Sequence, residues 1–332
     1  MKTRRLPLSG WVWLLGGWAG WPLWLPAQEA PQFTGVDRLT NNEIALTLSA
    51  PTGFSYRIDA ARDPAGWNGL VTLPTNNTTA LQLTDSAAPY LDARFYRASQ
   101  LTGTNIVSGD HLATTNGDVI IHPLYHASLV LSWNGKTIYN DPDDDPAYEF
   151  TYQGLPKADL ILVSHSHGDH FSATKIETLR GPNTRIIAPQ TVYNGLSAPQ
   201  KTNAIILNYG NSTNVMDLTI EAVYATNSNH LPLGFGNGYV LTIGGKRIYL
   251  SGDTGNIPQV RALTNLDVAF LCMNVPFTMT VTEATNAVRA FRPKVIYPYH
   301  YRDQSGTTAN AALFRQQLGT DLGIEVRLRK WY

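Results

Sequence analysis

Residues 164–170 read Ser-His-Ser-His-Gly-Asp-His, and they directly follow the apolar stretch Asp-Leu-Ile-Leu-Val at 159–163. The apolar stretch predicts a buried strand, so the histidines fall in a loop at a strand end, where alternating side chains can point to one centre. Three imidazoles and one carboxylate cannot all be buried there without partners, because desolvating unpaired polar groups is costly. Histidine and aspartate together suit zinc, manganese or iron. The segment therefore predicts a metal site, against the alternative of a solvated, histidine-rich loop.

The composition limits how such a metal could be held. The chain has 332 residues, which allows two domains, and its 25 basic and 25 acidic side chains cancel. A balanced chain lacks the charge that non-specific nucleic-acid binding needs, and we expect no nucleic-acid partner. The single cysteine, Cys272, excludes an intrachain disulfide and a cysteine-built zinc site. Any metal must be held by histidine and carboxylate, and Cys272 is expected to be a buried small hydrophobe.

The first residues have the pattern of a targeting segment. Three basic side chains occur within the first five residues, an apolar run follows at 11–25, and Ala27 precedes a polar stretch. We predict a signal peptide over residues 1–27 and a secreted or periplasmic protein. The alternative is a retained membrane anchor, although the apolar run is shorter than the roughly 20 residues that a spanning helix needs. Once processed, the protein is expected to have no stable membrane insertion.

Residues 31–102 predict a small all-β sandwich domain. Short alternating stretches are separated by Pro, Gly and Asn, with strands expected at 43–49, 55–59, 70–73, 80–84 and 94–98. The stretch resembles the small β-sandwich modules appended to many secreted bacterial enzymes. It contains no histidine and no clustered acids, so it should be an accessory or positioning domain. The alternative is a carbohydrate- or surface-binding module in which Trp67 and Tyr90 form a platform.

Residues 105–332 predict an α/β domain, because stretches with strand and helix patterns alternate. Strands are expected at 119–122, 128–132, 136–139, 160–163, 185–188, 204–207, 218–224, 239–243, 247–250, 268–272, 295–297 and 325–328. Helices are expected at 172–180, 189–197, 257–264, 281–291 and 309–318. Residues 280–283 read Thr-Val-Thr-Glu, a capping box that starts the fourth helix. Two sheets sandwiched between helices satisfy this order of elements.

The His-x-His-x-Asp-His pattern at 165–170 is the signature of the metallo-β-lactamase superfamily, and the chain resembles that family from about residue 105 to 332. Three later segments agree in order: 229–234 with His230, 238–255 with Asp253, and 294–301 with His300. Residues 126–142 resemble the opening hairpin of the branch that includes ascorbate-phosphate lactonases and the N-acyl-phosphatidylethanolamine phospholipase D group. The resemblance implies a catalytic domain with an αββα sandwich fold.

The resemblance also implies a two-metal site. His165, His167 and His230 would hold one divalent ion, Asp169, His170 and His300 would hold the second, and Asp253 would bridge them. Three of these residues have other readings: His230 as a surface-loop histidine, Asp253 as a turn aspartate, and His300 as a packed core histidine. Zinc is the expected metal, because it undergoes no redox change in an oxidising compartment, with Mn²⁺ or Fe²⁺ as alternatives.

Four further residues have weaker signals. His126 is either a group that contacts the pocket or a structural histidine, and Asp141 either orients a metal-bound histidine or forms a turn with the following proline. His111 and His122 lie outside any motif and are expected to be structural.

The expected function is hydrolysis of a small molecule. Two cations would acidify a shared water, and Asp169 and Asp253 would position the resulting hydroxide, so both are candidate catalytic residues. A lactone or other ester is the expected substrate, and a phosphodiester is the main alternative. Arg302, after His300, is the only basic residue near the ligands that could bind a phosphate. A different class, a surface-binding protein with a vestigial metal site, also remains open, as does the oligomeric state.

Overall fold

The computed structural model describes residues 30–332 except 104–105, 145–148, 233, 303–305 and 332. The predicted signal peptide, residues 1–27, lies outside the described residues. In the part of the chain that is described, no helix has the length and apolar character needed to cross a membrane.

The N-terminal strands form two facing layers. They are β1 (Gln32–Arg38), β2 (Ile44–Ser49), β3 (Ser55–Ala61), β4 (Asn68–Leu73), β5 (Ala80–Asp85) and β6 (Phe95–Leu101), with a 3-10 turn η1 (Ala88–Tyr90) before β6. Strands β1, β2 and β5 form a sheet of their own, while β3, β4 and β6 pair with one another. Alternating side chains from both layers meet in one core, including Leu48, Tyr56 and Ile58. A β-rich N-terminal region is therefore present, as predicted.

The next strands extend the β3-β4-β6 layer into a sheet of ten. They are β7 (Gly109–Leu112), β8 (Val119–Tyr125), β9 (Ser128–Trp133), β10 (Lys136–Asn140), β11 (Ala158–Leu162), β12 (Arg180–Ala188) and β13 (Ala204–Ile206). The order across the sheet is β13-β12-β11-β10-β9-β8-β7-β4-β3-β6, and β4 pairs antiparallel with β7. The predicted division near residue 103 stays a prediction, because hydrogen bonding continues across it through β4 and β7.

A second large sheet faces the first. Its strands are β14 (Ser212–Val215), β15 (Leu218–Ala225), β16 (Gly236–Ile243), β17 (Lys246–Leu250), β18 (Val268–Cys272), β19 (Val295–Tyr299) and β20 (Glu325–Val326), in that order across the sheet. Strands β17, β18 and β19 are parallel. Strand β18 reads Val-Ala-Phe-Leu-Cys and is buried throughout, as expected of an inner parallel strand covered on both faces. Cys272 is a buried free thiol, in agreement with the prediction.

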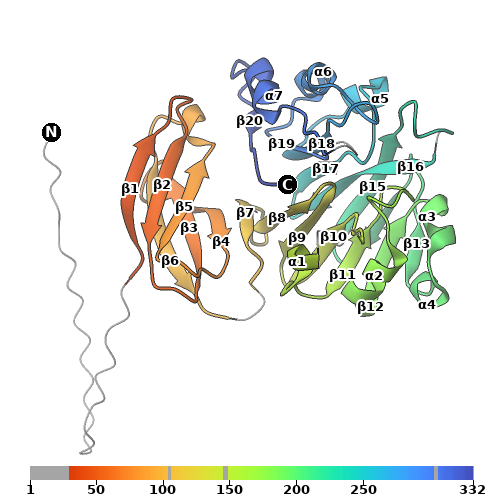
Figure 1. Ribbon diagram of the computed structural model, residues 1–332, viewed down its shortest axis with the longest axis horizontal. Helices are drawn as coiled ribbons and strands as arrows, with labels where there is room; N and C mark the ends of the chain where they lie inside the picture. The colour runs from red at the N-terminus through yellow and green to blue at the C-terminus, as the bar shows by residue number, and fades with distance from the viewer. Residues whose placement is uncertain (1–29, 104–105, 145–148, 233, 303–305, 332) are drawn as a thin grey trace, which may run out of the picture.

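Helices cover the outer faces of the two sheets (Figure 1). Those on the side of β8 to β13 are α1 (Glu149–Tyr152), α2 (Ala173–Leu179), α3 (Gln190–Gly195) and α4 (Ala198–Lys201); those beside β15 to β20 are α5 (Pro258–Arg261), α6 (Val281–Phe291) and α7 (Ala311–Leu318). Helix α6 begins at the predicted capping box, in which Thr280 Oγ1 accepts from the Glu283 N–H and Glu283 accepts from the Thr280 N–H. The four layers form the predicted αββα sandwich.

Sequence patterns placed most strands but missed three. Strands β1, β7 and β14 and helices α1 and α4 were not expected, and α5 ends at Arg261 rather than near 264. Strand β7 has four residues, too few to show an alternating pattern, yet it joins the two parts of the ten-stranded sheet. His111, in this strand, contacts Thr72 Oγ1 at 2.7 Å and Asp118 at 2.8 Å, which supports its expected structural role.

Candidate metal centre

All seven predicted ligands come from loops at one edge of the two sheets. The 165–170 loop follows β11, His230 follows β15, Asp253 follows β17, and His300 follows β19. Because β17 and β19 lie parallel in one sheet, their carboxyl ends reach the same edge. The β11 loop reaches it from the facing sheet: Ser164 O accepts from the Asn237 N–H of β16 at 2.8 Å.

The first group of ligand atoms is a triangle of ring nitrogens. Nε2 of His165, Nδ1 of His167 and Nε2 of His230 are each 3.2 Å from the other two. Ligands at about 2.0–2.2 Å from one ion in tetrahedral or octahedral geometry are themselves about 3.0–3.6 Å apart. These three nitrogens therefore have the spacing of ligands to a common ion.

The second group contains both histidine and carboxylate. Nε2 of His300 lies 3.0 Å from Nε2 of His170 and 3.5 Å from Asp169 Oδ2. His126, whose role the sequence left open, joins this group, since its Nε2 is 3.2 Å from Asp169 Oδ2. The ligand atoms of these four residues all lie within 4.8 Å of one another.

Asp253 lies between the two groups and faces both. Its Oδ2 is 3.5 Å from His230 Nε2 in the first group, and its Oδ1 is 3.3 Å from the Nε2 atoms of His170 and His300 in the second. The residue is buried, and Oδ1 accepts no hydrogen bond from the described residues. A buried carboxylate oxygen without a donor is expensive, and a cation would satisfy it. The donor set therefore fits two divalent cations bridged by Asp253, as the sequence predicts.

Hydrogen bonds on the far side of the rings orient the ligand nitrogens. Nδ1 of His230 is 2.8 Å from Asn227 Oδ1, and Nδ1 of His170 is 2.8 Å from Asp141 Oδ2. In each case Nδ1–H donates to the oxygen, so the lone pair of Nε2 points into the centre. Asp141 also accepts from the N–H and the hydroxyl of Ser164 at 2.6 and 2.8 Å. Asp141 thus orients His170, and it can do so while also forming a turn with the following proline.

Burial and repulsion from neighbouring imidazoles favour the neutral form of His165 and His230. Burial is the largest cause that lowers the pKa of His165 well below its ordinary value, and the neighbouring imidazoles lower it further. The pKa of His230 is lowered to about 4 by burial. His170 differs: burial lowers its pKa, but the carboxylates of Asp253 and Asp169 outweigh burial and raise it well above the ordinary value. A neutral imidazole is the form that binds a metal.

The centre opens on the side of His167 and Asp169. Both are exposed, and the Asp169 side chain keeps 49% of its surface, whereas His165, His170, His230 and His300 are buried. The Phe235 ring lies 5.0 Å from the His167 ring and forms a wall beside the opening. Leu231 directly follows the candidate ligand His230, and Val275 directly follows Asn274, which lies beside His300. Both Leu231 and Val275 are exposed. A substrate would therefore meet Asp169 and an apolar rim first.

Three functional neighbours carried no recognised signal in the sequence. Ser164, Asn227 and Asn274 contact ligand histidines, and Asn274 Nδ2 lies 3.4 Å from His300 Nδ1. Asn274 Oδ1 is buried and has no donor in the part of the chain that is described, so flipping this amide would let Oδ1 accept from the imidazole N–H. Each residue lies two positions after the end of a strand, β11, β15 or β18, and that position is the only signal available in the sequence.

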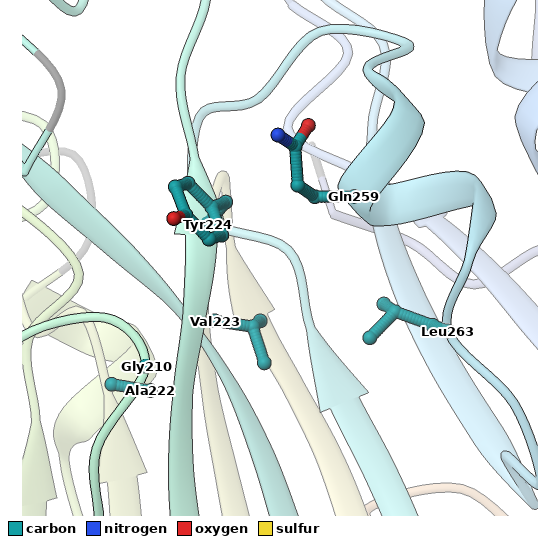
Figure 2. A pocket seen from close by; sticks show the side chains of 6 residues that line it. All are labelled: Gly210, Ala222, Val223, Tyr224, Gln259 and Leu263. Carbon is teal, nitrogen blue, oxygen red and sulfur yellow. The ribbon is translucent and has the colours of Figure 1, made fainter.

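A pocket away from the centre contains none of these groups. It has a volume of about 330 Å³ between β15 and α5 and is lined by Gly210, Ala222, Val223, Tyr224, Gln259 and Leu263. Figure 2 shows Gln259 and Leu263 on the α5 side facing Val223 and Tyr224 on the strand. Its lining is mostly apolar, so the chemistry belongs to the His/Asp edge.

The αββα layers and the His/Asp cluster at one sheet edge define a metallohydrolase of the metallo-β-lactamase fold. The chain belongs to the beta-lactamase superfamily domain family, whose profile matches residues 121–300. The predicted class, a metal-dependent hydrolase, is confirmed at this level; the branch with ascorbate-phosphate lactonases stays a prediction.

Relatives agree on the class. A UPF0173 metal-dependent hydrolase of Pyrococcus abyssi is 29% identical over 213 residues, covering 61% of this chain and 93% of the relative. A solved structure described as a metal-dependent hydrolase from Parabacteroides distasonis is 36% identical, with a TM-score of 0.60 over 68% of this chain and 99% of that one. Igni18, a metallo hydrolase from Ignicoccus hospitalis, is 25% identical, with a TM-score of 0.56 over 64% of this chain and 95% of that one.

Proposed function

We propose that this protein is an exported hydrolase of lactones or other carboxylic esters and that it uses two divalent cations. The cations are held by His165, His167 and His230 on one side, by Asp169, His170 and His300 on the other, and by Asp253 between them. The observation that carries the proposal is Asp253, whose two oxygens face the two groups and whose Oδ1 accepts no hydrogen bond from the described residues.

The residues of the chain have distinct parts in the reaction. Divalent cations bound here would acidify the attacking water and polarise the scissile carbonyl oxygen. Asp253 keeps the two cation positions close together, and its buried carboxylate holds no proton because the nearby His300 and His170 lower its pKa against the effect of burial. Asp169 is half exposed at the opening, and the neighbouring His170, His126 and His300 hold its pKa far below the ordinary value against the effect of burial, so its carboxylate stays charged and can orient the water.

The rim favours an ester over a phosphodiester. Phe235, Leu231 and Val275 offer apolar surface for an acyl chain or a lactone ring. Arg302, the basic residue that could bind a phosphate, donates to the Tyr125 hydroxyl. A phosphodiesterase would need the Arg302 guanidinium to face its substrate. Phosphodiester hydrolysis is therefore the second candidate function.

A substrate panel tests the proposal. The chain without residues 1–27, loaded with Zn²⁺ or Mn²⁺, should hydrolyse γ- and δ-lactones and p-nitrophenyl esters faster than bis-p-nitrophenyl phosphate. Chelation should abolish turnover, and adding metal back should restore it. Faster turnover of the phosphodiester would favour the second candidate, and no metal-dependent turnover of any substrate would favour a vestigial site.

Export is the remaining part of the proposal. The basic start, the apolar run at 11–25 and Ala27 support cleavage near Gln28. Sequencing the N-terminus of protein recovered from fractionated cells should find it near Gln28 outside the cytoplasm. An intact Met1 in the membrane fraction would indicate the anchor, and an intact Met1 in the cytoplasm would contradict export.

A further inference from the structure

His126 is fixed against the metal centre by its backbone. It lies in the turn between β8 and β9 and has a positive φ of 54°. Its carbonyl accepts from the His300 N–H at 3.0 Å, and its own N–H donates to Trp331 O at 3.4 Å. His300, with a φ of 45°, is also left-handed. A left-handed conformation is costly for non-glycine residues and persists where the surroundings enforce it, so the turn holds this ring in one place.

The ring of His126 is placed as a ligand would be. Its Nε2 is 3.2 Å from Asp169 Oδ2, within the range of about 3.0–3.6 Å for two ligands of one ion. Its ring centroid is 6.2 Å from that of His170, whereas the His170 and His300 centroids are 4.9 Å apart. The His126 and His300 centroids are only 3.7 Å apart, so His126 joins this group beside His300 rather than beside His170. The side chain is nearly buried, so water does not replace it there.

We propose that His126 is an additional protein ligand of the cation held by Asp169, His170 and His300. The inference rests on the proposed two-cation centre and deepens it, because it makes the two positions unequal. The first position has three histidines and Asp253 Oδ2, four donor groups in all. The second position has His126, Asp169, His170, His300 and Asp253 Oδ1, five donor groups.

The inequality predicts different metal preferences. Four nitrogen and oxygen donors suit tetrahedral zinc. Five donors with one open place suit a six-coordinate ion such as Mn²⁺ or Fe²⁺. Zinc has no geometric preference from its d-electrons and usually has four ligands in proteins. The second position should therefore retain Mn²⁺ in competition with Zn²⁺ better than the first position does.

The rival role for His126 is to donate a hydrogen bond to Asp169 without contacting the ion. Two variants separate the roles. His126→Asn keeps an N–H donor, tolerates the left-handed backbone and is a poor ligand, whereas His126→Gly removes the side chain and also accepts the positive φ. His122→Asn is the matched control, since His122 lies in the adjoining strand β8 and its Nδ1 bonds to Ser108 O at 2.7 Å, away from the centre.

The experiment is calorimetric titration of the metal-free chain, without residues 1–27, with Mn²⁺. Wild type and H122N should bind two ions per chain. In both H126N and H126G the ion at the position of His165, His167 and His230 should bind normally, and the ion at the second position should bind at least about 100-fold more weakly, beyond the roughly 10–100-fold effect of an outer hydrogen-bond partner. When Co²⁺ fills the second position, its molar absorption in the visible range should be higher in H126N than in wild type, because a lost ligand lowers the coordination number.

The outcomes separate this inference from the proposed function. Wild-type affinity at the second position in H126N, with the loss confined to H126G, would mean that His126 only orients Asp169 and would overturn the proposal. A wild-type chain that binds a single ion would overturn it while leaving a metal-dependent hydrolase possible. A wild-type chain that binds no ion would overturn both. Melting curves of the metal-free variants confirm that each is folded.

Discussion

Two buried aspartates in this molecule have opposite surroundings. Asp110, in β7, accepts from Arg329 Nε and Nη2 at 2.9 and 3.0 Å and from the Tyr297 hydroxyl at 2.7 Å. Asp253, in the metal centre, has one oxygen with no donor among the described residues. Burial raises the pKa of both carboxyls, but cationic neighbours outweigh it and leave both below their ordinary value. Both are therefore charged at neutral pH.

The difference separates a structural charge from a functional one. The neighbours of Asp110 are arginines, which stay charged in any environment, so this cluster is complete without a ligand. The neighbours of Asp253 are histidines, which can lose their protons and bind a cation instead. A buried acid among histidines, with one oxygen that accepts no hydrogen bond, thus indicates a metal site. A buried acid among arginines indicates an ion-pair cluster that stabilises the fold.

The largest expected effect is the loss of catalysis in Asp253→Asn. The substitution replaces one carboxylate oxygen with an amide nitrogen, so the side chain can no longer bridge two cations. We expect kcat/KM on the preferred ester to fall by more than about 100-fold, which exceeds the usual effect of losing a hydrogen-bond partner of a ligand. Bound metal should fall below two ions per chain by elemental analysis. The metal-free variant should lose little stability, because Asp253 Oδ1 accepts no hydrogen bond from the described residues. Two bound ions with full activity would contradict the bridging role.

Asp110→Asn should show the reverse behaviour. Without the carboxylate, Arg329 loses its ion-pair partner, whereas Arg327 keeps Glu325 at 2.7 Å, and the free energy of unfolding should fall by about 3–5 kcal/mol. Activity per folded molecule should stay unchanged, because Asp110 contacts no ligand residue. Urea unfolding followed by circular dichroism, beside an ester assay on the folded fraction, measures both quantities. A large loss of activity in fully folded protein would contradict the purely structural role of Asp110.

The same variant predicts a pH dependence. The pKa of Asp110 in the folded protein lies below its ordinary value of 3.8, because Arg329 and Arg327 outweigh the effect of burial. Its stabilising contribution is therefore complete above about pH 3.8 and is lost as the pH falls through the folded-state pKa. The stability difference between wild type and Asp110→Asn should be constant from about pH 5 to 8 and shrink below about pH 4.

A smaller effect is expected for Asp141→Asn. Asp141 accepts from His170 Nδ1 and from Ser164, and the amide retains one acceptor oxygen but loses the charge. Metal affinity at the second position should fall by about 10–100-fold, with the first position unchanged. Titration with Mn²⁺ measures each step. Equal weakening at both positions would mean that Asp141 supports the whole loop rather than His170.

Sequence patterns and the family resemblance together singled out the seven candidate ligands, because each lies within a motif or directly after an apolar strand. They could not place His126, because a histidine in a tight hairpin has no pattern of its own. It reaches the centre only because β8 and β9 lie in the sheet whose neighbouring strands end there. The Asp110 cluster was missed for a similar reason. Its arginines follow β20 near the end of the chain, and only the fold brings them to β7.

The smallest expected effect concerns the contact between the N-terminal layers and α7. Glu43 pairs with Arg315 at 2.6 Å, and the Arg315 side chain keeps 33% of its surface. Partly exposed ion pairs contribute about 1 kcal/mol or less, so a double-mutant cycle with E43Q and R315Q should give a coupling energy in that range. The ten-stranded sheet already joins the two parts through β4 and β7, so the cycle should leave a single cooperative unfolding transition. Two separate transitions in the double variant would instead show that this side-chain pair, rather than the continuous sheet, couples the N-terminal strands to the hydrolase fold.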